Sequence, residues 1–259
     1  MDPTLAVLYQ RRAALDAELT AADGSAAVDP DVARFIAEIS WITPPGDPRN
    51  HPPRVPADAA DEIMKESELL RRLGDKAPGV TDGPLPSSTQ LWVATGRGSA
   101  RANLLDPSHF IDSDRASGGL ASTKPFEFGL YTSSGQLGEF GMWWCYLELN
   151  RGSSLFPLPW RVWSLEVDSQ ARVLEISTAM AWVEFVAAKP VRKYGLLYPD
   201  WKLAGARWDG VHMTLRAIAA TQGVAFCAGN DVVAPPYWDV ESTLWLRWSF
   251  TSAEEKSIS

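Results

Sequence analysis

The chain has 259 residues, of which 46% are hydrophobic and 22% charged, a balance typical of a soluble globular protein. It excludes a disordered or collagen-like chain, and no apolar run approaches the roughly 18 residues that a membrane-spanning helix needs. The formal net charge is −8. Acidic residues outnumber basic ones fifteen to nine in residues 1–84, so no nonspecific DNA-binding arm is expected there.

The N-terminal sequence has an acid at residue 2 and no uncharged apolar core, so we expect no signal peptide, no membrane association and a cytoplasmic protein. Two cysteines and three histidines lie far apart in the sequence. Their spacing fits neither a zinc motif nor a disulfide framework, and we therefore expect no metal cofactor.

The first 84 residues are predicted to begin with two helices. Asp2 and Pro3 are a capping residue followed by a proline at the first helical position, and Asp29 with Pro30 repeats this signal. The apolar residues that follow each pair recur at helical spacing, which indicates two short amphipathic helices.

Six prolines between residues 43 and 56 predict a loop, because proline lacks the backbone donor that a helix or a sheet needs. A third helix is expected over residues 57–73, ending at Gly74. Residues 1–84 are thus interpreted as a helical appendage. It either packs on the main domain or offers a docking surface to a neutralising partner protein.

Residues 85–259 are interpreted as a separate α+β domain that contains all but one of the 12 tryptophans. The sequence has no phosphate-binding loop, no dinucleotide-binding glycine motif and no Gly-x-Ser-x-Gly motif. Strands are predicted over residues 90–95, 128–132, 160–167, 173–176 and 241–250, and helices over 178–188 and 200–206.

Three segments occur in an order that resembles the ADP-ribosyltransferase superfamily, which includes bacterial toxins and the poly-ADP-ribose polymerases. They are LWVATGRG (91–98), FGLYTSS (128–134) and WDVESTLW (238–245). Members of that family have a first strand with Arg or His, a second with aromatic and Ser/Thr residues, and a late strand that opens with a catalytic Glu.

The resemblance implies a split β-sheet core and an enzyme that releases nicotinamide from NAD and transfers ADP-ribose to a protein or nucleic-acid acceptor, as a toxin or effector does. It implies that Glu241, Arg97 and Ser133 are catalytic. By the same resemblance, Thr95, Tyr131, Thr132 and Arg97 bind NAD.

The chemistry of NAD cleavage suits these residue types. Loss of nicotinamide leaves an oxocarbenium-like ribose, which a nearby carboxylate such as Glu241 stabilises. The planar guanidinium of Arg97 can bind the pyrophosphate through two hydrogen bonds, and the ring of Tyr131 can stack on the cationic nicotinamide.

Three alternatives remain open from the sequence. Water can replace the acceptor, which makes the chain an NAD glycohydrolase. The tryptophan content also fits a noncatalytic module that binds a glycan or nucleic acid. Finally, Val93, Ala94 and Thr95 stand where the polymerases have His, and Asp239 stands where toxins have Glu or Gln, which fits a transferase that binds NAD without turning it over.

Overall fold

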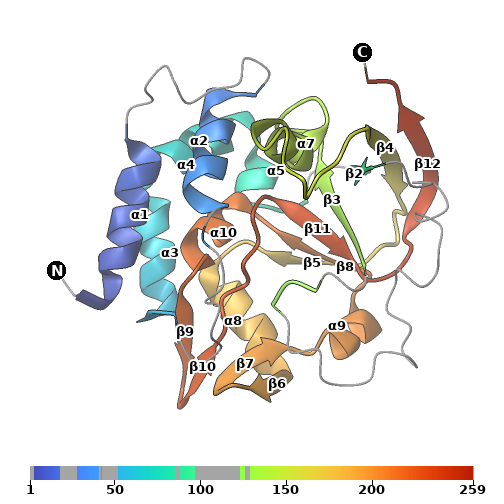
Figure 1. Cartoon of the computed structure of the whole chain (residues 1–259). Coiled ribbons are helices and arrows are strands. Elements are labelled where there is room, and N and C mark those ends of the chain that lie inside the picture. The colour runs from blue at the N-terminus through green and yellow to red at the C-terminus, as the bar shows by residue number, and fades with distance from the viewer. Residues whose placement is uncertain are drawn as a thin grey trace.

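The computed structural model describes residues 3–17, 28–40, 42, 52–85, 88–96, 123–125 and 129–258. This part of the chain is an α+β protein, as the sequence predicts. Its strands form two mixed sheets with helices packed around them (Figure 1). The N-terminal helices lie together on one side of the molecule, and β12, β4 and β2 lie on the other.

The helix expected after Asp29 begins where its capping residue predicts. The Asp29 carboxylate accepts hydrogen bonds from the backbone N–H groups of Asp31 and Val32, and Pro30 occupies the first turn. Asp2 lies outside the described residues. The helical elements of this part are a 3₁₀ turn (Pro3–Leu5), α1 (Ala6–Asp16), α2 (Pro30–Ile39), α3 (Ala57–Lys65), α4 (Glu68–Lys76) and α5 (Pro78–Thr81).

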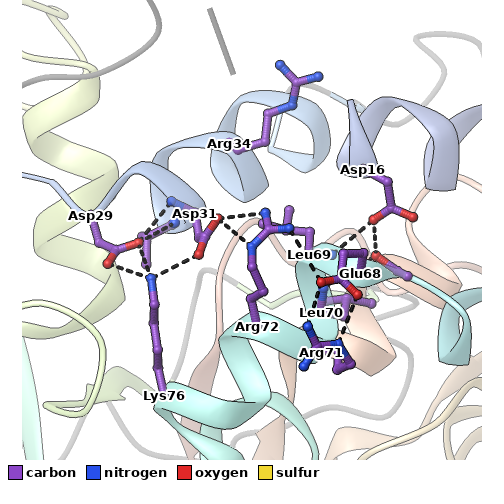
Figure 2. Close-up of polar contacts among 12 residues, drawn as sticks. Asp16, Asp29, Asp31, Arg34, Glu68, Leu69, Leu70, Arg71, Arg72 and Lys76 are labelled. Atoms are coloured by element: carbon purple, nitrogen blue, oxygen red, sulfur yellow. Dashed lines mark hydrogen bonds and ion pairs between the residues drawn. The ribbon is translucent and has the colours of Figure 1, made fainter. Parts of the chain in front are cut away.

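The single helix expected over residues 57–73 is wrong, because the chain forms two helices, α3 and α4. Ser67 separates them: its hydroxyl accepts from the Leu70 N–H, 3.3 Å away, and donates to the Asp16 carboxylate at 2.8 Å. Asp16 also accepts from the Leu69 N–H (Figure 2). A cap supplied partly by α1 thus starts a new helix, which continues past Gly74.

Ion pairs join α2 to α4 (Figure 2). Asp31 accepts from Arg72 at 2.8 Å and from Lys76 at 2.9 Å, and Lys76 also pairs with Asp29 at 2.8 Å. Burial raises the pKa of Asp31, but the hydrogen bonds from Arg72 and Lys76 outweigh it, so the pKa is lowered. Because Arg72 and Lys76 are about 40% exposed, each pair stabilises the fold by no more than about 1 kcal/mol.

The smaller sheet contains a strand where the sequence predicts only loop. Arg54 and Val55 form β1 (Arg54–Val55), which pairs in parallel with Ala225 and Phe226. The proline-rich sequence permits this because the carbonyl of Pro53 accepts from the Ala225 N–H. The sheet order is β1, β9 (Ala225–Ala228), β10 (Asp231–Val233), β7 (Leu196–Pro199) and β6 (Pro190–Lys193).

The larger sheet is split between its third and fourth strands. β2 pairs with β4 along all its residues, but with β3 only through Gln90↔Ser134 and Leu91↔Ser133. Beyond Leu91 the two strands diverge. The sheet order is β12 (Phe250–Lys256), β4 (Trp160–Val167), β2 (Thr89–Thr95), β3 (Leu130–Ser134), β11 (Ser242–Trp245), β8 (Gly210–Met213) and β5 (Val173–Ile176).

The continuous strand expected over residues 241–250 is wrong. β11 ends at Trp245, and the N–H groups of Leu246 and Arg247 both donate to the carbonyl of Asp209, at 2.8 and 3.3 Å. These bonds bend the chain, and β12 starts only at Phe250. The other strands match their predictions, with β4 and β5 at the expected bounds and β3 shifted by two residues; residues 126–128 lie outside the described part.

Four further helices pack against the sheets. Thr178 and Asp200 cap α8 and α9, at the predicted positions. The other two helices are not predicted, although Thr214 caps the second of them by accepting from the Ala217 N–H at 3.2 Å. The four helices are α7 (Gly141–Leu149), α8 (Ala179–Ala188), α9 (Trp201–Arg207) and α10 (Leu215–Thr221).

One buried cluster extends across the predicted division at residues 84–85. It joins Leu8, Phe35 and Leu70 to Trp182 and Met213. The N-terminal helices therefore pack on the rest of the chain and share its core, while the division into residues 1–84 and 85–259 stays a prediction. Among the described residues, no helix is both long and apolar enough to cross a membrane.

Arg11 fastens α1 to α10. Its buried guanidinium donates to the carbonyl of Ala219 at 2.5 Å and to that of Gln222, at the C-terminal end of α10. Burial lowers the pKa of Arg11 to about 10. The guanidinium supplies donors to helix carbonyls that would otherwise lack partners.

We expect Arg11→Met to lower the free energy of unfolding by about 2–4 kcal/mol, because it removes charged hydrogen bonds and leaves two carbonyls unpaired. The matched control is Arg12→Met, at a less buried position where the guanidinium lies over the Tyr9 ring. Urea unfolding followed by circular dichroism measures both. Equal losses in the two variants would contradict the role given to Arg11.

Candidate functional site

A cleft of about 280 Å³ opens where β2 and β3 diverge. It lies between the end of β2, the start of β3 and the helix α7, which packs on both strands. Its lining is mainly aromatic and aliphatic: Trp92, Val93, Thr95, Gly129, Leu130, Tyr131, Trp143, Leu147 and Phe156.

The aromatic walls of this cleft are braced by other rings. Trp143 packs edge-on against Tyr146, with ring centroids 5.5 Å apart, and Tyr146 packs in the same way on Phe156 at 5.7 Å. Tyr131 meets Trp238 at 5.7 Å and donates its hydroxyl to the Pro125 carbonyl at 2.7 Å. Such edge-to-face contacts fix ring orientation, so the walls are preorganised.

A partly buried ion pair lies against two of these walls. Lys124 Nζ is 2.5 Å from the Asp239 carboxylate, 5.1 Å from the ring centroid of Trp143 and 5.8 Å from that of Tyr131. The Asp239 side chain is 25% exposed and that of Lys124 only 4%. Burial, with a smaller contribution from Asp239, raises the pKa of Tyr131 well above its ordinary value, so this phenol stays neutral.

On the opposite face of the sheet, a histidine lies between two carboxylates. His212 Nδ1 is 2.6 Å from Glu175 Oε1, and Nε2 is 3.0 Å from Glu241 Oε1. Glu175 and His212 are direct partners in the β5–β8 register. Both His212 and Glu241 are 0% exposed. We call these three residues the Glu–His–Glu chain.

Each nitrogen–oxygen contact in this chain needs a proton, since two lone pairs would repel each other. The three groups therefore hold two protons and a net charge of −1 in the interior. Burial disfavours the charged ring, but the hydrogen bonds that the ring donates to both carboxylates outweigh it and raise the pKa of His212 to about 9. Burial likewise raises the pKa of Glu241.

The same face carries further buried polar groups. Thr132 donates to the Gln90 side chain at 2.6 Å and accepts from the Trp245 indole N–H at 2.8 Å. The hydroxyls of Ser134 and Thr243 are also buried, and neither has a hydrogen-bond partner within the described part of the chain. A row of buried polar side chains thus lies on this face where β2 and β3 are still paired, at Gln90↔Ser134 and Leu91↔Ser133. We call this place the closed end of the split.

The residues predicted from the sequence are divided between these two places. Thr95 and Tyr131 line the cleft, whereas Thr132 and Glu241 lie on the other face with Gln90 and His212. Arg97 lies outside the described residues.

Ser133 is on the α7 side of the sheet. Its buried hydroxyl accepts from the Trp143 N–H at 3.4 Å, at the start of α7. Gly141 permits this approach, since a Cβ there would lie 2.5 Å from the Ser133 hydroxyl and its φ is +79°.

Sequence reasoning missed several residues of the site. Trp143 and Phe156 come from segments between the motifs. Lys124 is also outside the motifs, and only the tertiary structure brings it against the walls of the cleft. His212 belongs to none of the three motifs, and its carboxylate neighbours become visible only with the register of β5 and β8. The one usable signal is the alternation of side chains along each strand, which predicts that Tyr131 and Thr132 point to opposite faces of the sheet.

A second hollow, of about 290 Å³, lies between α8 and α9. Leu174, Phe185 and Trp208 line it, with Glu184 and Arg207 among its charged residues. No buried, unpartnered polar side chain among the described residues belongs to this hollow, so it offers less to a ligand than the cleft.

No protein-family model, no curated protein and no solved structure matches this chain. Within the described ranges, no three His, Cys, Asp or Glu side chains are grouped so that they could hold a metal ion. The site must therefore be interpreted from its own geometry.

The raised pKa of His212 predicts how stability depends on pH. A group whose pKa rises from 6.5 to about 9 on folding contributes stability that is complete below pH 6.5 and is lost as pH rises through 9. We expect the free energy of unfolding to fall by roughly 3 kcal/mol between pH 6.5 and 9.5, at about 1.4 kcal/mol per unit. Urea unfolding at each pH measures it, and His212→Gln should lack this fall. A flat wild-type profile would contradict the protonated ring.

Proposed function

We propose that this chain binds NAD in the cleft between β2 and β3, releases nicotinamide and transfers ADP-ribose to a macromolecular acceptor. The observation that carries the proposal is the position of the cleft. It lies at the split between the first two strands that resemble the ADP-ribosyltransferase superfamily, and Thr95 and Tyr131 line it. The third such segment, at β11, is the other neighbour of β3.

The size and lining of the cleft support one end of NAD as its ligand. A volume of about 280 Å³ is slightly below the usual range of about 300–1,000 Å³ for ligand pockets, which fits one flat ring with its sugar. Tyr131 and Trp143 offer aromatic surface. The indole N–H of Trp143 is buried without a partner among the described residues, and it suits the carboxamide oxygen of nicotinamide.

The carboxylate for this chemistry is better supplied by Asp239 than by Glu241. Glu241 is fully buried and bonded to His212 on the other face of the sheet. Asp239 is partly exposed and pairs with Lys124, whose ammonium lies 5.8 Å from the ring centroid of Tyr131. In this proposal Asp239 stabilises the positive charge that develops on the ribose, and Glu241 maintains the structure.

The alternatives use the same cleft differently. With water as the acceptor the reaction is NAD hydrolysis, and product analysis distinguishes the two outcomes. A binding module with tryptophans displayed on its surface has less support, because among the described tryptophans only Trp248 reaches an exposed fraction of 36%.

Trp143 and Trp248 provide a matched test of the cleft. We expect Trp143→Ala to weaken NAD binding about tenfold or more, since stacking on an aromatic side chain contributes about 1–3 kcal/mol. Trp248→Ala, outside the cleft, should bind as the wild type does. Isothermal titration calorimetry with NAD measures both, and absence of NAD binding to the wild type would refute the proposal.

The rate of nicotinamide release distinguishes the roles of Asp239 and Glu241. We expect Asp239→Asn to slow nicotinamide release from labelled NAD by about 10²-fold or more, because charge stabilisation in the transition state is lost. Glu241→Gln should alter stability more than turnover per folded molecule. The reverse pattern would return the catalytic role to Glu241. If neither the wild type nor these variants release nicotinamide, the chain is a binding protein.

A further inference from the structure

We infer that the Glu–His–Glu chain is a proton-dependent clasp that holds the closed end of the split between β2 and β3. The inference concerns the conformation of the cleft and does not depend on which ligand the cleft takes. It follows from the place where Glu241 meets β3.

Glu241 lies at the hinge of the split. The β3–β11 ladder runs from Trp245↔Leu130 to Thr243↔Thr132, and beyond it the Ser134 N–H donates to the carboxylate of Glu241, with N···O distances of 3.3 and 3.4 Å. Ser134 is also the residue that pairs with Gln90 of β2. The carboxylate therefore extends the ladder by one bond at the position where β2 joins it.

The clasp connects this hinge to three other segments. His212 belongs to β8 and Glu175 to the edge strand β5. Glu175 Oε2 accepts from the Leu85 N–H at 2.9 Å, in the segment after α5. Gly83 leaves room for this contact, because a Cβ there would lie 2.8 Å from Glu175 Oε1.

The charge of the clasp makes it sensitive to proton loss. With two protons the three groups carry a net charge of −1. With one proton they carry a net charge of −2, and one ring nitrogen of His212 then presents a lone pair to a carboxylate. The side chains that β2, β3 and β11 add on this face, among them Gln90, Thr132 and Thr243, are neutral. Two cations on adjoining segments are paired with other carboxylates: Arg172, just before β5, with Asp209 at 3.3 Å, and Arg216, in α10, with Asp82.

Loss of one proton leaves one of the two His212–carboxylate contacts without a hydrogen bond, and it should therefore loosen the chain of contacts that fixes Glu241 against Ser134. At the closed end of the split, two residue pairs and the Thr132–Gln90 hydrogen bond connect β2 to β3, so a shift of Ser134 acts on a short connection. The cleft would then widen at its inner end. Since Glu175 is 25% exposed and the other two residues are buried, protons enter and leave through Glu175.

Hydrogen–deuterium exchange of the full chain tests the clasp. Peptides covering β3 and β11, after correction for intrinsic exchange, should exchange at least tenfold faster at pH 10 than at pH 7. Peptides covering α4 should not change. In Glu175→Gln, where one carboxylate no longer stabilises the charged ring, the increase should begin at a lower pH. Glu255→Gln, on the exposed strand β12, is the matched control and should follow the wild type.

The wild type alone supplies a second measurement, which is needed if Glu175→Gln does not fold. The imidazole resonances of His212 should show a protonated ring through pH 8. A ring that titrates near pH 6.5, or β3 peptides whose corrected exchange is the same at pH 7 and pH 10, would overturn the inference. Failure to bind NAD would affect only the proposed function.

Discussion

β2 and β3 share two residue pairs, while each is bonded along most of its length to a different neighbour. This unequal pairing determines the rest of the site. Because β4 holds β2 and β11 holds β3, the two strands separate beyond Leu91 and Ser133, and side chains from α7 and from the loop before β4 line the space between them. The cleft is thus a product of topology, and its aromatic lining follows from the helix that covers both strands.

Side chains of the five-residue strand β3 point into two different environments. Tyr131 faces aromatic rings and the Lys124–Asp239 pair, whereas Thr132 faces Gln90 and Trp245. Strand alternation alone produces this separation. One face is largely apolar apart from the Lys124–Asp239 ion pair; the other concentrates hydroxyls, an amide, an imidazole and two carboxylates. In the inferred clasp, a charge change on the polar face reaches the cleft through the backbone of β3, by way of Ser134.

A local signal in the sequence predicted what it physically controls. Asp29 caps α2 because its side-chain oxygen reaches N–H groups two or three residues away, and the helices predicted from residues 178 and 200 prove to begin with caps of the same kind. The missed features depend on distant partners. The break at Ser67 needs Asp16, and the bend after Trp245 needs the carbonyl of Asp209. For the site, the sequence identified Thr95 and Tyr131 on the cleft, but it assigned Glu241 to the cleft as well, since neither the register of β8 nor the face of His212 can be derived from spacing.

The bond from Arg11 to α10 spans 208 residues of sequence, and this separation has a consequence during synthesis. At about 5–20 residues per second, the first helix waits roughly 10–40 s for its carbonyl acceptors to be translated. Until then the Arg11 guanidinium lacks its native acceptors, although the helices α2, α3 and α4 that α1 contacts have already been translated. The connection between α1 and α10 is therefore completed late in synthesis, after the packing of α1 on its neighbouring helices has become possible.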